Sequence, residues 1–104
     1  MKRVLEGVRY DTDKAIKIGS DTNGLPVSDF SYWWAGLYKA PRSDRYFLAG
    51  EGGAMSMFGS VSGDNRGYGE RIQPMTKKEA LAWAEEHLEA DIIDEFFGDM
   101  IEDA

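Results

Sequence analysis

A stretch rich in aromatic residues, followed by a turn and a second apolar stretch, constrains the fold more than any other feature. Residues 30–39 (FSYWWAGLYK) precede the turn 40–44 (APRSD) and the extended run 45–49 (RYFLA), which predicts an antiparallel hairpin. Side chains alternate across a strand. One face therefore carries Phe30, Tyr32, Trp34, Gly36 and Tyr38, and the other carries Ser31, Trp33, Ala35 and Leu37. Both faces have apolar bulk, so one covers the core and a helix, a loop or a partner must cover the other.

The strongest local signal is the start of a helix near the C-terminus. Thr76 and Glu79 have the spacing of a capping box, in which each side chain satisfies a backbone donor of the other. An apolar stripe continues this helix to about residue 88. Residues 90–97 predict a second helix with its isoleucines and phenylalanines turned inward, and Gly98 ends it.

The remaining segments complete an α+β pattern. Residues 4–10 predict two extended stretches joined by a glycine turn, and residues 13–18 predict a brief helix capped by Asp11 or Thr12. Residues 59–69 predict a mobile glycine-rich loop and residues 70–74 a last strand, whereas residues 54–58 fit either a helix or a strand. We expect one domain over 1–104: an antiparallel sheet of about four to five strands, packed by two to three short helices, of which the C-terminal ones are acidic.

Composition bears on the cellular compartment. The 104 residues include no cysteine, which excludes disulfides and thiolate metal sites and favours a reducing compartment. No apolar run approaches the roughly 18 residues that a membrane helix needs. We therefore expect a cytoplasmic protein.

Charge is distributed unevenly along the chain. The net charge is −7; residues 1–75 hold nine acids and ten bases (+1), and residues 76–104 hold ten acids and two bases (−8). Such a field repels nucleic acid and attracts cationic surfaces within a Debye length of about 8 to 10 Å. The alternative is a solvated acidic face that only keeps the protein soluble.

Motifs for catalysis or cofactor binding are weak. His87 and Asp91 have i,i+4 spacing, as a metal site requires, but one histidine among surface acids is more typical of a solvated helix. No serine lies in a nucleophile elbow, and residues 50–53 (GEGG) match no phosphate-binding loop. Stacking of bases on the aromatic run would need a basic groove beside it. We therefore expect no enzyme activity, no catalytic residues, no metal and no cofactor.

The acidic end gives the sharpest functional hypothesis. If residues 79–103 were wholly helical, they would place a carboxylate about every 3.6 Å, close to the 3.4 Å phosphate spacing of one DNA strand. A break near Ala90 or Gly98 would fold this line into a compact patch. The predicted partner-binding residues are Glu85, Glu86, Glu89, Asp91, Asp94, Glu95, Asp99, Glu102 and Asp103. The exposed aromatic face is a candidate hydrophobic anchor beside them.

Several segments together resemble a known group of proteins. They are residues 10–15 (YDTDKA), 37–39 (LYK), 46–48 (YFL), 50–55 (GEGGAM) and 79–88 (EALAWAEEHL). In this order they are similar to a family of small acidic accessory proteins found on phages, plasmids and integrative elements. The resemblance implies a non-enzymatic, anti-CRISPR-like inhibitor, expected to be a monomer, that imitates DNA and blocks target binding by a Cas effector. An acidic antitoxin or regulator that neutralises a basic partner is the alternative, and a module centred on His87 is a second one.

Overall fold

The computed structural model describes residues 1–104, and its fold is α+β. The elements are β1 (Lys2–Leu5), β2 (Val8–Asp11), β3 (Ile16–Thr22), β4 (Trp33–Lys39), β5 (Tyr46–Gly52), β6 (Ser60–Ser62), β7 (Asn65–Gly67), β8 (Gly69–Met75), α1 (Lys77–His87), α2 (Ala90–Phe97) and a 3₁₀ turn (Gly98–Met100). The main sheet is antiparallel with the order β3-β4-β5-β8, and β1-β2 and β6-β7 form separate hairpins. The predicted class is confirmed, with four strands in the main sheet.

The predicted hairpin forms the centre of the sheet. Trp33 pairs with Gly52 and Lys39 with Tyr46 along the β4-β5 ladder. Strand β4 begins at Trp33, later than predicted, because residues 29–32 form a turn in which Tyr32 N–H donates to the Asp29 carbonyl over 3.1 Å. The alternation of the two faces along this strand is as predicted.

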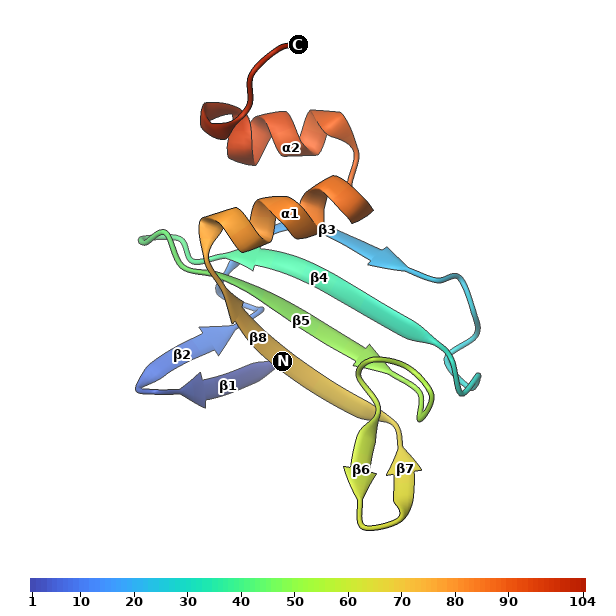
Figure 1. Ribbon diagram of the computed structural model, residues 1–104. Helices are drawn as coiled ribbons and strands as arrows, with labels where there is room; N and C mark the ends of the chain where they lie inside the picture. The colour runs from blue at the N-terminus through green and yellow to red at the C-terminus, as the bar shows by residue number, and fades with distance from the viewer.

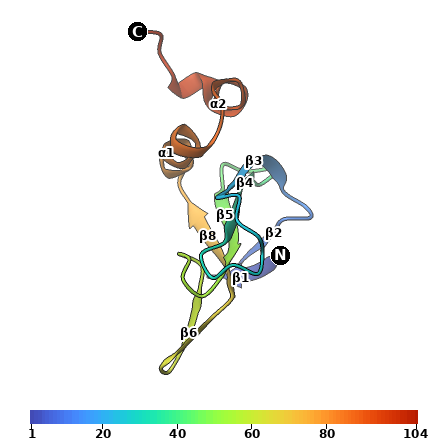
Figure 2. The same ribbon diagram turned by 90° about the vertical axis from the view of Figure 1, so that its right-hand side faces the viewer.

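Different layers cover the two apolar faces of the sheet. Helix α1 lies across one face and α2 stacks beyond it, whereas the β1-β2 hairpin lies against the other face (Figures 1 and 2). Leu37 and Leu48 pack under the helices with Ala80, Ala84 and Phe97. Tyr38, Phe47 and Ile72 pack under the hairpin with Tyr10. The chain itself therefore covers the Tyr38 end of the aromatic face, whereas Trp34 is half-buried and Phe30 stays 72% exposed.

The predicted helix at residues 13–18 is wrong. Asp11 does cap a turn, since its Oδ1 accepts from Asp13 N–H at 3.0 Å and its carbonyl accepts from Ala15 N–H at 3.1 Å. The chain then enters β3 at Ile16, and Ile18 is buried in the core. Pairing with β4 and burial of a β-branched residue outweigh the weak local preference for a helix.

The glycine-rich segment also has more structure than predicted. Residues 60–62 and 65–67 pair as the β6-β7 hairpin, and Gly63 at its tip has a φ of 61° that suits glycine. Residues 54–58 form turns, belonging to neither a helix nor a strand. Phe58 at their end is buried and packs over Gly50 of β5, where a Cβ would come within 2.2 Å of the ring.

Candidate functional site

The capping box that starts α1 is present. Glu79 N–H donates to Thr76 Oγ1 at 3.1 Å, and Thr76 N–H donates to Glu79 Oε1 at 2.9 Å. The backbone hydrogen bond from Thr76 lowers the pKa of the Glu79 carboxyl. Glu79 is therefore committed to helix capping and is not part of the candidate binding surface.

A sharp break separates α1 from α2. Leu88 and Glu89 both have extended backbone angles, and Leu88 packs its side chain onto Gly19 of β3. Glu89 stands at the N-cap position of α2, but its side chain makes no capping hydrogen bond. The line of charge is therefore broken at Leu88 and Glu89 and is not one continuous helix, in agreement with the predicted break near Ala90.

The most deeply buried contact of helix α2 is Phe97. Phe97 is fully buried and its ring stacks on Tyr46 of β5, with 5.7 Å between the ring centroids. Ile92, Ile93 and Phe96 are half-buried along the same side of the helix. The opposite side carries exposed Asp91, Asp94 and Glu95. Packing of one face thus fixes the acids on the outermost layer of the molecule (Figure 1).

The nine predicted partner-binding residues are all exposed. Asp99 is paired with Lys77, with 2.8 Å between Oδ2 and Nζ, and Glu86 Oε2 lies 3.9 Å from His87 Nε2. The ion pair lowers the pKa of Asp99 and raises that of Lys77. The other seven (9 − 2) make no ion pair: Glu85, Glu89, Asp91, Asp94, Glu95, Glu102 and Asp103. We call these seven residues the acidic surface.

The acidic surface does not help α2 to form. Asp91 faces Asp94 at i,i+3 and Glu95 at i,i+4, and like charges at these spacings destabilise a helix. Asp94 and Glu95 also lie near the negative end of the helix dipole, where acids are unfavourable. No lysine or arginine of the chain offsets them. This charge distribution is unfavourable for the isolated domain, and a cationic surface would relieve it.

His87 is occupied by packing interactions. Its ring stacks on Trp83 with 4.3 Å between centroids and meets the edge of Trp33 at 5.8 Å. Its Nδ1 lies 2.9 Å from Asp21 Oδ2, and this hydrogen bond lowers the pKa of the Asp21 carboxyl. The histidine thereby ties the end of α1 to β3, a role that the sequence did not indicate.

His87 and Asp91, the weak metal-ligand candidates of the sequence, lie in different helices. Asp91 is in α2, and no group of three or more histidine, aspartate or glutamate side chains is arranged to hold a metal ion. Neither helix has the length and apolar composition to cross a membrane.

Comparison with known proteins gives no match: no family model fits the sequence, and no curated protein or solved structure is significantly similar to it. The resemblance to acidic accessory proteins of mobile elements therefore stays a prediction.

Proposed function

We propose that this protein is a non-enzymatic, anti-CRISPR-like inhibitor. It binds a nucleic-acid-binding effector, such as a Cas complex, in the cytoplasm of a host cell and blocks the binding of target DNA. The acidic surface occupies the channel of lysines and arginines that otherwise holds the phosphates of the target.

The observation that carries this proposal is a set of unpaired carboxylates on a docked scaffold. Seven of the nine predicted partner-binding acids make no ion pair, and five of these (Glu85, Glu89, Asp91, Asp94 and Glu95) lie on or between two helices packed on the sheet. A flexible tail with the same charge would lose much conformational entropy on binding. Carboxylates on packed helices lose less conformational entropy, which favours tighter binding.

The spacing of the acids on α2 suits a phosphate-binding partner. The eight residues of α2 span about 12 Å at 1.5 Å per residue. Asp91 and Asp94 are then about 4.5 Å apart along the axis, and Asp94 and Glu95 about 1.5 Å apart, an average of about 3 Å against the 3.4 Å phosphate spacing of a DNA strand. A channel built for phosphates would therefore meet carboxylates at a similar interval.

The first test is recovery of the partner at two salt concentrations. Tagged protein is incubated with host lysate at about 50 mM and about 500 mM salt, where screening differs strongly, and bound proteins are identified by mass spectrometry. We expect a nucleic-acid-binding complex at low salt that is lost at high salt. A small basic toxin instead would favour the antitoxin alternative, and the absence of any salt-sensitive partner would contradict the proposal.

Two triple variants separate the acidic surface from net charge. The α2-neutral variant carries Asp91→Asn, Asp94→Asn and Glu95→Gln. The matched control carries Asp13→Asn, Asp64→Asn and Glu70→Gln, all exposed acids outside the helices. Each variant changes the net charge from −7 to −4. We expect only the α2-neutral variant to lose binding of the partner. An equal loss of binding in both variants would mean that net charge, and not the acidic surface, drives the binding.

A further inference from the structure

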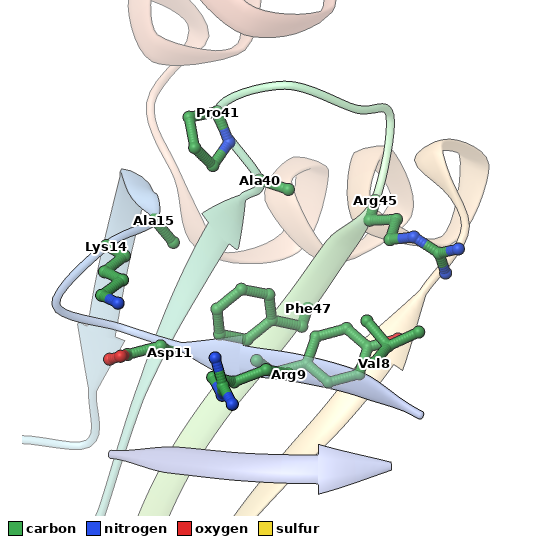
Figure 3. Close-up of a pocket in the computed structure, with 10 residues that line it drawn as sticks. Val8, Arg9, Asp11, Lys14, Ala15, Ala40, Pro41, Arg45 and Phe47 are labelled. Carbon is green, nitrogen blue, oxygen red and sulfur yellow. The ribbon is translucent and has the colours of Figure 1, made fainter. Parts of the chain in front are cut away.

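A hollow opens on the face of the sheet opposite to the helices. It lies between β2 and the turn that joins β4 to β5 and has a volume of about 240 Å³ (Figure 3). Phe47, Ala15 and Pro41 supply part of an apolar wall. Sites for drug-sized ligands are usually roughly 300–1,000 Å³, so this one suits a smaller molecule, about one aromatic ring with a substituent.

Three cations from separate segments surround this hollow. Arg9 comes from β2, Lys14 from the turn before β3, and Arg45 from the residue before β5. In Figure 3, Lys14 and Arg9 lie to one side of Phe47 and Arg45 lies to the other. All three are exposed, and none makes an ion pair.

The charge of this wall is opposite to that of the whole chain. Asp11 is its only acid, so the wall carries 3 − 1 = +2 while the chain carries −7. One oxygen of Asp11 is already engaged, since it accepts a hydrogen bond from Asp13 N–H. An anion entering the hollow therefore meets three cations that have no partner within the protein.

The backbone around the hollow is already ordered. Ala40 N–H donates to the Arg45 carbonyl over 2.9 Å, which closes the β4-β5 turn. On the other side, Ala15 N–H donates to the Asp11 carbonyl over 3.1 Å. Binding would require little rearrangement of either turn, so only the cationic side chains would lose freedom.

We infer that this hollow binds a planar aromatic anion, a single ring that carries a carboxylate or a phosphate. The ring packs against the accessible apolar wall of Ala15, Ala40 and Pro41, and the anionic group accepts charge-assisted hydrogen bonds from Arg9, Lys14 and Arg45. The ring alone or the anionic group alone would bind weakly, since the apolar wall is small and exposed ion pairs are screened by water. This site lies on the face away from the acidic surface and does not depend on the proposed inhibitor function.

The test is a titration followed by ¹H–¹⁵N correlation NMR, with phenyl phosphate as the probe. We expect saturable shifts at the amides of Arg9, Lys14 and Arg45, with an affinity in the micromolar to millimolar range typical of a ligand with so few atoms. Inorganic phosphate, which lacks the ring, and benzyl alcohol, which lacks the anionic group, should each bind at least about tenfold more weakly. Phosphate binding as tightly as the probe would overturn the inference, as would the absence of saturable shifts.

Substitutions of single arginines locate the contact. Arg9→Gln and Arg45→Gln should each weaken binding of phenyl phosphate about tenfold, because each removes one charge-assisted hydrogen-bond donor. Arg42→Gln is the matched control, since Arg42 is exposed in the same turn but does not line the hollow. The spectrum of each variant reports its folding. Equal weakening by all three substitutions would refute the site.

A second titration arm distinguishes two sources of the same chemistry. Adenosine 5′-monophosphate carries a larger ring system and the same kind of anionic group. Because the hollow suits a single ring, we expect adenosine 5′-monophosphate to bind more weakly than phenyl phosphate, and tighter binding would overturn the single-ring assignment in favour of nucleotides. Saturable binding of neither ligand would overturn the inference.

Discussion

Truncation of Phe97 tests whether its packing holds helix α2, and with it the acidic surface, on the sheet. Helix α2 has only eight residues, too few to be stable without tertiary packing. Phe97 is fully buried, with 0 % of its surface exposed, and its ring stacks on Tyr46. Phe97→Ala should therefore cost about 3–5 kcal/mol, the usual range for truncating a buried aromatic ring. That is a large part of the roughly 5–15 kcal/mol expected for the whole domain.

Thermal unfolding followed by circular dichroism measures this loss. Each 1 kcal/mol lowers the midpoint of a domain of this size by about 4–8 °C, so we expect a fall of at least about 12 °C. Phe96→Ala is the matched control, because the neighbouring ring is only half-buried and should cost clearly less. A Phe97→Ala variant that loses no more stability than Phe96→Ala would refute the anchoring of α2 through Phe97.

Three further substitutions test local features by denaturant or thermal unfolding. Thr76→Ala should cost about 1 kcal/mol by removing the N-cap, with Thr76→Ser near wild type; equal losses in both would contradict the capping role. The lowered folded pKa of Asp21 means that its bond to His87 stabilises the fold above the unfolded pKa of about 3.9 and is lost as pH falls through the lower folded value. The midpoint difference between wild type and Asp21→Asn should therefore shrink below about pH 4, and a constant difference would argue against the carboxylate. Gly50→Ala should cost about 1–3 kcal/mol by displacing the Phe58 ring, and unchanged stability would show that the ring moves freely.

Signals carried by a few adjacent residues predicted the helical half of the fold well. The Thr76-Glu79 capping box, the apolar stripe of α1 and Gly98 set the observed bounds of the two helices to within a residue or two. The same periodicity placed Phe97 inside and Asp94 outside. The predicted helix at residues 13–18 was wrong because these residues lead into β3. Strand β3 pairs with β4, which lies about 20 residues further along the chain.

Contacts across the sheet explain what the sequence could not show about the candidate site. Lys77 and Asp99 are 22 residues apart, and His87 and Asp21 are 66 apart, so neither pairing follows from local spacing. The hollow near Phe47 gathers its cations from three segments, and only the folded chain brings Arg9 and Arg45 to one wall. Exposure of the acids within the two helices, by contrast, followed from helical periodicity alone.

The most direct test of the proposed function is a mobility-shift assay of target DNA with a guide-loaded Cas effector from the host. Wild-type protein and the matched control should both prevent formation of the effector–DNA complex, and the α2-neutral variant should not. Circular dichroism should show all three to be folded. Equal inhibition by the α2-neutral variant, or no inhibition by the wild-type protein, would contradict the claim that the acidic surface takes the place of DNA.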